Sequence, residues 1–586
     1  MSDIDVTPKD QETRRLRLSA LRRAIADAGV DAYLIPLADE FQGEYVPTHA
    51  QRLAWLTGFT GSAGLAIVTS AAAGMFVDGR YTLQVVEQTP AELYAHRGHT
   101  AQHQAEWLTE LGDAAPEVIG YDPWLHTPSQ LEGLRTRAAR SGITLKPLEG
   151  NLIDGIWDDQ PAPPSAPIRI HPMDYAGVSH ADKLTELAGT LQDAGHDAAV
   201  LTLPDSICWL LNVRGADVPH NPVVLAMGIL HSDATLELFL DPSRVDDALA
   251  THLGASVTVR PREQLGGALD ALTHQTVRID PKHTASWVLD RLERARIEVA
   301  RDADPCLLPK ATKNPVELEG MRRAHRRDGV AIVKMLKWLD DHAPRGEVDE
   351  LSAVATLLTF RQQDDTFIGD SFATIAGAGP NGAIVHYRAT PESNRRLGAD
   401  EMFLLDSGGQ YVDGTTDITR TIFNGEPNAE HKDRFTRVLK GHIALSSLIF
   451  PEGTTGSAID AFARSALWQV GVDYAHGTGH GVGSHLAVHE GPQRVSKHPN
   501  KIELEPGMVV SNEPGYYKSD AFGIRIENLI AVTAPAPVEG GELEMMQFED
   551  LTLAPIQRKL IEVPLLSHAE RAWIDTYHAR VLRELS

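Results

Sequence analysis

The chain has 586 residues, about four times the ~150 residues of a typical domain, so the sequence predicts several domains. Hydrophobic residues make up 42% and charged residues 23%, as in ordinary globular proteins, which excludes a disordered or fibrous chain. The 54 Lys and Arg against 80 Asp and Glu give a formal net charge of -26, which disfavours binding to nucleic acid or to an anionic membrane surface.

The cysteine count and the start of the chain bear on location. Two cysteines, Cys208 and Cys306, are too few for a disulfide framework, which fits a reducing compartment. The first thirty residues lack an apolar signal-peptide core, and no apolar run reaches the ~18–20 residues of a membrane span. We therefore expect a cytoplasmic protein.

A repeated pattern indicates two similar domains in the N-terminal half. Residues 27–32 read Asp-Ala-Gly-Val-Asp-Ala, and residues 193–198 read Asp-Ala-Gly-His-Asp-Ala. Each copy follows an amphipathic helical pattern that the glycine ends, and each precedes a short apolar strand. Further matches, such as Trp55 with Trp209, occur in the same order, so we expect a duplicated α/β domain. A proline-rich linker, residues 159–167, separates the copies.

A third domain is predicted to begin with a helix. Residues 314–317, Asn-Pro-Val-Glu, combine an N-cap residue, a proline suited to the first helical position and a glutamate at N3. The arginine-rich run 322–327 is expected to lie on the solvated face of this helix. The predicted domains are residues 10–158, 159–312 and 313–586.

Two acids further on are predicted to face each other across a hairpin. Residues 402–406 form an apolar run that ends in Asp406, and Asp417 lies on the returning strand. Asp413 and Gly414 supply the turn signal between them. A short antiparallel pair would bring both carboxylates within reach of one centre.

More candidate ligands follow in glycine-rich and strand-end contexts. His476 and His480 lie among glycines, His489 follows, and Glu513 and Glu527 each end an apolar strand pattern. Together with the hairpin acids this is a hard, oxygen-rich donor set, which suits manganese, cobalt or a related divalent ion better than a thiolate zinc site. Two divalent ions would offset four carboxylates and activate a water molecule, whereas one ion would leave the site overcharged.

One other motif is predicted to be accidental. Residues 377–382 spell the glycine fingerprint of dinucleotide-binding folds. Residues 383–387, which follow it, read as a strand, whereas that fingerprint needs a helix N-terminus to hold a pyrophosphate.

The motifs in this part of the chain, taken in order, resemble those of the cytosolic, three-domain form of aminopeptidase P, the Xaa-Pro aminopeptidase. They are Leu-Leu-Asp-Ser-Gly at 404–408, Asp-Gly-Thr-Thr-Asp-Ile-Thr-Arg-Thr at 413–421, Gly-Thr-Gly-His-Gly-Val-Gly at 477–483, Val-His-Glu-Gly-Pro at 488–492, Asn-Glu-Pro-Gly-Tyr-Tyr at 512–517 and Gly-Ile-Arg-Ile-Glu-Asn at 523–528. The resemblance implies two tandem creatinase-N-like α/β domains, a pita-bread catalytic domain of the α+β class, and a homodimer.

The resemblance also implies a ligand set for two divalent metal ions, with manganese (Mn²⁺) preferred and Co²⁺ or Zn²⁺ as alternatives. Asp417 and Glu527 would bridge the ions, Asp406 would hold one of them, and His480 and Glu513 would complete the other.

Catalytic roles follow from the same resemblance. His386 and His489 would contact the scissile carbonyl and the tetrahedral intermediate, and Glu513 would act as acid and base. Arg525 would lie on the same strand face as Glu527, where it would orient a ligand carboxylate or simply be a surface arginine. Tyr517 is a weak candidate for the proline pocket and would more often be ordinary packing.

The activity implied is release of the N-terminal residue from peptides with proline at the second position, through attack of a hydroxide that two metal ions activate. Within enzymes, prolidase and methionine aminopeptidase are the alternatives. A non-enzymatic pita-bread module that reads peptides or histones is the alternative from another class, and the intact ligand set disfavours it.

Overall fold

The computed structural model describes residues 11–586. These residues form two compact units. The N-terminal unit runs to His171 and includes Val178–Cys306, and the C-terminal unit consists of Pro172–Gly177 and Leu307–Ser586. Among residues 11–586, no helix combines the length and the apolar character needed to cross a membrane.

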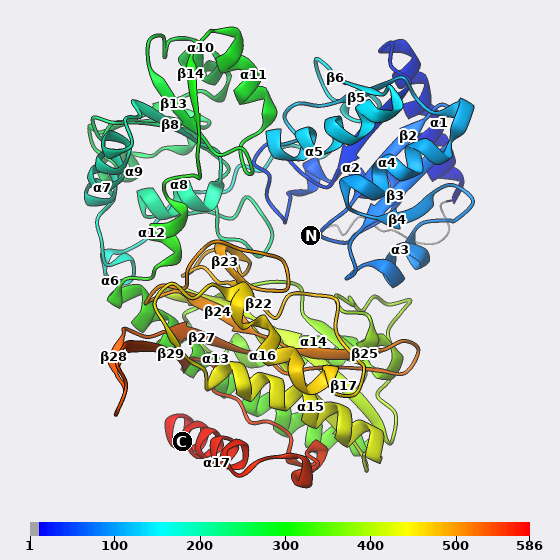
Figure 1. The fold of residues 1–586 in the computed structure, drawn as a ribbon, viewed down its shortest axis with the longest axis vertical. Coiled ribbons are helices and arrows are strands. Elements are labelled where there is room, and N and C mark those ends of the chain that lie inside the picture. Colours follow the sequence, from blue (N-terminus) through cyan, green and yellow to red (C-terminus); the bar gives the residue numbers. More distant parts are fainter. Residues whose placement is uncertain (1–10) are drawn as a thin grey trace. The chain divides into compact units, whose positions relative to one another are not determined.

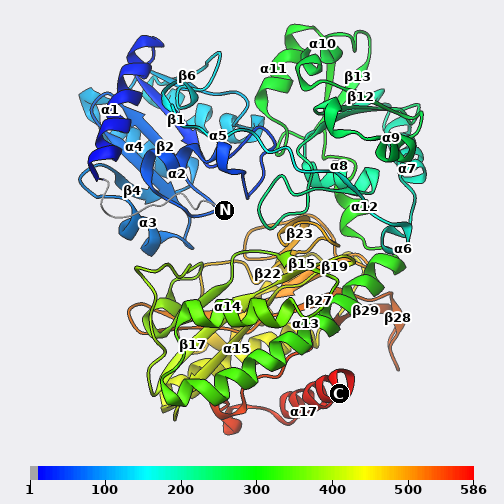
Figure 2. The ribbon, with the colours of Figure 1, turned by 180° about the vertical axis from the view of Figure 1, so that it is seen from behind.

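The N-terminal unit contains two six-stranded sheets with the same topology (Figures 1 and 2). The first has the order β4-β3-β2-β1-β5-β6, and the second has the order β12-β11-β10-β8-β13-β14. In each order the second, third and fourth strands pair antiparallel with one another. The first strand and the last two strands pair in parallel with their neighbours. The predicted duplication is therefore confirmed at the level of strand order and direction.

The first sheet and its helices consist of β1 (Ala32–Pro36), β2 (Leu65–Thr69), β3 (Ala73–Val77), β4 (Ala95–Gly98), β5 (Val118–Tyr121), β6 (Thr144–Pro147), α1 (Gln11–Asp27), α2 (Arg52–Thr57), α3 (Thr82–Gln88), α4 (Ala101–Glu110) and α5 (Pro128–Ala138). The second consists of β8 (Ala198–Leu201), β10 (Met227–His231), β11 (Leu236–Phe239), β12 (Val257–Arg260), β13 (Thr276–Ile279), β14 (Glu298–Arg301), α7 (His180–Asp193), α8 (Pro204–Leu211), α9 (Asp247–Leu253), α10 (Leu265–Asp270) and α11 (Ser286–Arg294). A two-stranded pair, β7 (Arg169–Ile170) and β9 (Val213–Arg214), adjoins it.

The helix ends that the repeat predicted are present. Gly29 follows α1 with φ 63°, and Gly195 follows α7 with φ 72°. Only glycine adopts this left-handed conformation at no steric cost, so both helices stop just before the repeated glycine, at Asp27 and at Asp193. Apolar side chains then pack on both faces of the first sheet, because its central strands are buried throughout.

The C-terminal unit is built from antiparallel strands enclosed by helices, which is an α+β arrangement. Its largest sheet has the order β21-β29-β27-β24-β22-β23, with β28 paired to β29, and a three-stranded sheet has the order β16-β17-β20. Helices α15 and α16 cover these strands on the side that Figure 1 shows. Helices α13 and α14 cover them on the opposite side, which Figure 2 shows. The predicted fold class, two α/β domains followed by an α+β domain, is confirmed.

The helices of this unit are α6 (Met173–Ala176), α12 (Leu307–Ala311), α13 (Pro315–His342), α14 (Glu350–Arg361), α15 (Ala429–Ser446), α16 (Gly456–Trp468) and α17 (His568–Leu585). Its strands are β15 (Phe367–Asp370), β16 (Ile375–Ala378), β17 (Glu401–Ser407), β18 (Gly409–Tyr411), β19 (Gly414–Thr415), β20 (Ile418–Asn424), β21 (Ile449–Pro451), β22 (Gly479–Gly481), β23 (Glu490–Val495), β24 (Val509–Asn512), β25 (Gly515–Lys518), β26 (Phe522–Arg525), β27 (Asn528–Val532), β28 (Ala536–Pro537) and β29 (Glu544–Asp550).

Helix α13 begins as the sequence predicts. The Asn314 side chain accepts hydrogen bonds from the backbone N–H groups of Val316 and Glu317, and the Glu317 carboxylate accepts one from the Asn314 N–H. The reciprocal pair is a capping box, with Pro315 at the first helical position.

The expectation for the arginine-rich run was partly wrong. Arg323 and Arg327 both donate to the carboxylate of Asp413, which is buried in the β18–β19 turn, and Arg322 pairs with Glu549. These arginines therefore hold α13 against two strands instead of lying only in solvent.

The strand predicted for residues 383–387 is absent. The chain there forms a short 3-10 helix, Gly379–Ala383, and then a loop. The fingerprint at 377–382 does not open an α-helix, as predicted, although the following element was misjudged.

Candidate metal centre

Two of the predicted ligands come from one antiparallel pair of strands. Asp406 lies near the end of β17, and Asp417 immediately precedes β20. Asp406 faces Thr419 in this register, so both carboxylates lie at the same end of the pair. The chain between them makes the β18–β19 hairpin, which turns at Val412 and Asp413, one residue before the predicted turn.

The other three predicted ligands come from neighbouring strands of the largest sheet. His480 is the middle residue of β22, Glu513 follows β24, and Glu527 precedes β27. Strand β24 lies between β22 and β27, so His480, within β22, comes from a strand next to the one that ends before Glu513, and Glu527 lies at the start of the strand on the other side.

Glycine on both sides of His480 lets these strands approach closely. A Cβ atom at Gly479 would lie 1.9 Å from the Ser511 carbonyl oxygen, and one at Gly481 would lie 2.5 Å from the Glu490 carbonyl oxygen. Any larger residue would push the backbone away, which explains the Gly-His-Gly pattern at this position.

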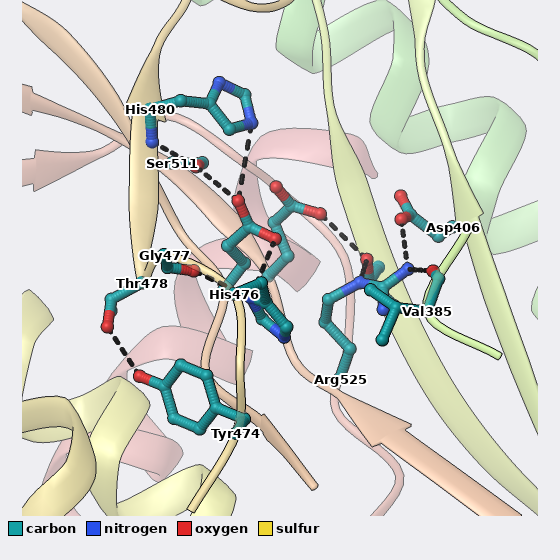
Figure 3. Close-up of polar contacts among 12 residues, drawn as sticks. Val385, Asp406, Tyr474, His476, Gly477, Thr478, His480, Ser511 and Arg525 are labelled. Atoms are coloured by element: carbon teal, nitrogen blue, oxygen red, sulfur yellow. Dashed lines mark hydrogen bonds and ion pairs between the residues drawn. The ribbon is translucent and has the colours of Figure 1, made fainter. Parts of the chain in front are cut away.

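Four of the five predicted ligands meet directly. One atom from each of Asp417, His480 and Glu527 lies within 4.8 Å of the others. The Nε2 atom of His480 is 3.5 Å from Oδ2 of Asp417 and 3.4 Å from Oε1 of Glu513. Figure 3 shows His480 and the surrounding polar contacts.

The fifth predicted ligand, Asp406, is joined to this group through Arg525. Arg525 donates from Nη2 to Oδ2 of Asp406 at 2.5 Å and from Nε to Oγ1 of Thr419 at 3.1 Å (Figure 3). Thr419 in turn donates to Oε2 of Glu527 at 2.8 Å. Arg525 is therefore no surface arginine: it is 1% exposed and orients a predicted ligand carboxylate.

The carbonyl group of the next residue, Gly481, sets the tautomer of His480. Its Nδ1 lies 2.9 Å from the carbonyl oxygen of Gly481, which can only accept, so Nδ1 carries the proton in the neutral ring. The Nε2 lone pair then faces Asp417 and Glu513, as a metal-ligating imidazole requires.

Burial and crowding shift the proton affinities of the acids. Burial, with the nearby charges of Asp417, Glu513 and Asp406, raises the pKa of Glu527 well above its ordinary value. Burial also raises the pKa of Glu513 and that of Asp406, although the cations His480 and Arg525 respectively oppose the rise. For His480, burial lowers the pKa, but Asp417 and Glu513 outweigh burial and raise it to about 9.

These residues fit a pair of divalent cations. The Oδ1 atoms of Asp406 and Asp417 are buried and accept no hydrogen bond from any residue in the described range 11–586. Buried carboxylate oxygens without donors are costly unless a cation faces them. Four carboxylates with one imidazole form the hard donor set that manganese and related ions prefer.

Of the two predicted catalytic histidines, His489 lies directly against this group, and His386 is placed only through the main chain that precedes it. The His489 ring is 4.3 Å from the His480 ring, centroid to centroid, in an edge-to-face arrangement. His386 follows Val385, whose carbonyl oxygen accepts a hydrogen bond from Arg525 at 3.3 Å (Figure 3).

Three further side chains belong to the site: His476 and Ser511, to which the sequence analysis gave no role, and Tyr517, a weak candidate for the proline pocket. His476 Nε2 lies 2.8 Å from the hydroxyl of Tyr517, and its Nδ1 lies 4.0 Å from Oε2 of Glu513. Arg525 also donates to the Tyr517 hydroxyl at 2.6 Å, so Tyr517 is part of a hydrogen-bonded network and not ordinary packing. Ser511 donates to Oε1 of Glu513 at 3.0 Å. The signals for His476 and Tyr517 were their places in the glycine-rich run and after Glu513.

Family models match nearly the whole chain. A model described as metallopeptidase family M24 matches residues 319–534, and one for the C-terminal region of peptidase M24 matches residues 544–586. Models described as the creatinase/prolidase N-terminal domain match residues 17–156 and 159–317.

Individual proteins match over most of their own length. Aminopeptidase P2 of Arabidopsis thaliana is 41% identical, over 97% of this chain and 86% of its own. A probable Xaa-Pro aminopeptidase P of Coccidioides posadasii is 39% identical, over 96% of this chain and 95% of its own.

Solved structures share the fold. The X-prolyl aminopeptidase of Caenorhabditis elegans, described as a cytosolic enzyme with a di-nuclear active site, superposes with a TM-score of 0.92 at 33% identity. It covers 98% of this chain and 96% of its own. An Xaa-Pro dipeptidase of Bacillus anthracis, at 22% identity and a TM-score of 0.53, shares the fold over 65% of this chain. The chain therefore belongs to the Xaa-Pro aminopeptidases, the aminopeptidase P family, with the catalytic domain of the M24 metallopeptidases.

Proposed function

We propose that this protein is a metalloaminopeptidase that releases the N-terminal residue from peptides whose second residue is proline. The observation that carries the proposal is the meeting of Asp417, His480 and Glu527 within 4.8 Å, with Glu513 at 3.4 Å from His480. The family to which the chain belongs supplies the substrate class. A bond into proline is a tertiary amide without an N–H group, so its cleavage calls for a dedicated site.

The proposed cofactor is a pair of divalent ions. Asp417 and Glu527 are assigned to both ions, Asp406 to one, and His480 and Glu513 to the other. When bound, such ions make water nucleophilic at neutral pH and polarise the scissile carbonyl. Manganese is the proposed metal, with cobalt and zinc as alternatives, and the di-nuclear description of the Caenorhabditis elegans enzyme supports two ions.

The protein's own side chains have separate tasks in this proposal. Arg525 holds Asp406 in one orientation, and the Gly481 carbonyl keeps Nε2 of His480 directed at the acids. Glu513 is the proton carrier, and the hydrogen bond from Ser511 to its Oε1 leaves Oε2 to exchange the proton.

The histidines are assigned to the reacting carbonyl. His386 and His489 would donate hydrogen bonds to the oxygen that becomes negative in the transition state. Each such donor is worth about 10²–10³ in rate. Glu513 would then pass its proton to the proline nitrogen, because the leaving amine cannot depart as an anion.

The wider assignments belong to the same proposal. We assign the domains to residues 10–158, 159–312 and 313–586, which the extents of the matched family models support. A cytoplasmic homodimer is proposed, and the cytosolic description of the Caenorhabditis elegans enzyme supports the location.

A substrate panel tests the activity. An Xaa-Pro-containing tripeptide should be cleaved after its first residue, whereas an Xaa-Pro dipeptide would be the preferred substrate of a prolidase and a Met-initiated peptide that of a methionine aminopeptidase. Preference for either of the latter two would overturn the substrate assignment.

Chelation tests the cofactor. Treatment with EDTA followed by gel filtration should abolish cleavage, and added Mn²⁺ should restore it, with Co²⁺ and Zn²⁺ compared at equal concentration. Full activity in the metal-free protein, verified by elemental analysis, would contradict the dimetal proposal.

A further inference from the structure

The strands that carry Glu513 and Glu527 each place an asparagine next to the acid. Asn512 is the last residue of β24, Asn528 is the first of β27, and the two are direct cross-strand partners. Neighbouring strand residues point to opposite faces, so the asparagines lie behind the acids. Both are fully buried, which means that this rear face needs hydrogen-bonding partners of its own.

Arg420 from β20 fills the rear face behind Glu527. It donates from Nη1 to the carbonyl oxygen of Glu527 at 2.6 Å and to that of Thr419 at 2.9 Å, and from Nη2 to Oδ1 of Asn528 at 2.8 Å. Thr419 is the residue whose hydroxyl holds the Glu527 carboxylate. Arg420 therefore fixes both the main chain of Glu527 and the neighbour that orients its side chain.

Among residues 11–586, Arg420 donates no hydrogen bond to a carboxylate. Its acceptors within the described chain are all neutral: the carbonyl oxygens of Thr419, Glu527, Ala554 and Pro555, the amide of Asn528 and the hydroxyl of Tyr577. A fully buried guanidinium held only by neutral acceptors depends on every one of them, because each lost acceptor leaves a buried N–H unsatisfied.

One of these acceptors comes from the C-terminal helix α17. The hydroxyl of Tyr577 accepts from Nη2 of Arg420 at 3.0 Å and donates to the carbonyl oxygen of Thr552 at 3.0 Å. Tyr577 is 4% exposed, and Trp573, one turn earlier, stacks on its ring with centroids 5.1 Å apart. The hydroxyl is thus aimed inward and held in place.

The same helix also reaches the support of Glu513. The Trp573 ring lies edge-on to His442 from α15, at 6.0 Å between centroids. His442 Nδ1 lies 3.0 Å from the carbonyl oxygen of Asn512, and the Asn512 side chain donates to the His442 carbonyl at 2.9 Å. Helix α17 therefore supports Glu527 through Arg420 and Glu513 through His442 and Asn512.

We propose that Tyr577 is a positioning residue of the metal centre, acting through Arg420 on Glu527. The inference rests on the proposed function and deepens it. It gives a task to α17, which lies within the segment that matches the C-terminal region of peptidase M24. Helix α17 packs behind the site, and the hydrogen bond between the Tyr577 hydroxyl and Arg420 links the helix to Glu527.

The test separates this role from plain packing by removing one oxygen atom. Tyr577→Phe keeps the ring and its stacking on Trp573, whereas Ile574→Val, at another buried position of the same helix, removes one methyl group and no polar contact. Titration calorimetry of the metal-free proteins with Mn²⁺ should give a dissociation constant at least ~10-fold higher for Tyr577→Phe and unchanged for Ile574→Val, in line with the effect of outer partners on metal sites. Activity of Tyr577→Phe should recover at saturating Mn²⁺.

Several outcomes would overturn the inference. If the dissociation constant of Tyr577→Phe for Mn²⁺ lies within twofold of the wild-type value, the Tyr577 hydroxyl does not position the metal centre. Equal losses of Mn²⁺ affinity in Tyr577→Phe and Ile574→Val would mean that helix α17 contributes only packing.

A second variant checks the path through Arg420. The lysine in Arg420→Lys cannot bind the carbonyl oxygens of Thr419 and Glu527 as the guanidinium does, so this single variant should already weaken Mn²⁺ binding. Adding Tyr577→Phe to it should reduce the Mn²⁺ affinity little further. Additive losses would show that Tyr577 does not act through Arg420. A wild-type protein that binds no Mn²⁺ would contradict the proposed function, whereas normal wild-type binding with an unaffected Tyr577→Phe would contradict this inference alone.

Discussion

Arg525 donates a 2.5 Å hydrogen bond to Oδ2 of Asp406, and both side chains are almost completely buried. Asp406 therefore has one oxygen committed to a guanidinium and presents only Oδ1 to a cation. The arrangement places a fixed positive charge beside four carboxylates, so part of their repulsion is offset before any ion binds. Burial alone would lower the pKa of Arg525, but the Tyr517 hydroxyl and the carboxylates of Asp406, Glu513 and Glu527 outweigh it and raise that pKa well above its ordinary value, which keeps Arg525 charged.

Replacing Arg525 by lysine should lower activity about 10–100-fold. Lysine keeps the charge, but it cannot donate at once to Asp406, Thr419 and Tyr517 as the guanidinium does. The measurement is kcat/KM on an Xaa-Pro tripeptide at saturating Mn²⁺. Arg437→Lys is the control, because Arg437 binds the Asp433 carboxylate on α15. Similar activity in both variants would remove Arg525 from the site.

His489→Ala should reduce turnover by about 10²–10³ while metal content stays close to that of wild type. His489 lies against the predicted ligand His480, at 4.3 Å between ring centroids, but is not itself assigned to a metal. Steady-state kinetics and elemental analysis on the same sample separate the two effects. His498→Ala, an exposed histidine in the loop that follows β23, is the control and should behave as wild type. Wild-type turnover in His489→Ala would end its assignment.

Local signals predicted the parts of the site that local structure determines. The pairing of Asp406 with Asp417 follows from a strand, a turn signal and a returning strand. The helix ends at Gly29 and Gly195 follow from a conformation that glycine tolerates best. Each of these features depends on residues close together in the chain, which a sequence pattern records.

Features set by distant partners could not be predicted. The apolar run 383–387 resembles a strand, but Asn381 and Tyr387 both bind the fully buried carboxylate of Glu350, which holds the segment in a turn. Arg323 and Arg327 read as a solvated face because nothing nearby in sequence shows that Asp413 lies opposite. Tertiary contacts outweighed periodicity in both places.

Glu490→Gln should lower the free energy of unfolding of the C-terminal unit by about 3–5 kcal/mol. The Glu490 side chain is fully buried, and its carboxylate binds the ammonium groups of Lys310 and Lys313. The side chains of both lysines are 1% exposed. The amide leaves two buried cations without their counter-charge. Urea denaturation of the metal-free protein, followed by fluorescence, measures the change.

An exposed pair serves as the comparison for Glu490. Glu430 and Lys518 form an ion pair at 2.7 Å with side chains 41% and 44% exposed. Solvent screening makes such a pair worth only about 0–1 kcal/mol, so Glu430→Gln should change the midpoint little. If Glu490→Gln were as mild as Glu430→Gln, the buried cluster would contribute no stability.

The stability of the N-terminal unit should fall as pH rises towards about 7, because of Asp39. Burial raises the pKa of Asp39 to about 7 from its ordinary 3.8, helped by the nearby charge of Glu40. Between those pH values the folded protein holds a proton that the unfolded chain has released, so the free energy of unfolding decreases with rising pH. The contribution is fully present below about 3.8 and is lost through about 7, a change of roughly 4 kcal/mol at most.

Asp39→Asn should abolish this part of the pH dependence. The asparagine is neutral at every pH, and its Oδ1 can still accept the hydrogen bonds that Asp39 receives from the N–H groups of Phe41 and Gly43. Melting temperatures at pH 5 and pH 8 should therefore differ less in the variant than in wild type, with the variant the more stable at pH 8. Asp27→Asn, at the exposed end of α1, should keep the wild-type difference. Because other buried acids titrate in both proteins, only the difference between wild type and Asp39→Asn reports on Asp39, and identical pH profiles would show that its carboxyl is ionised in the folded state at neutral pH without penalty.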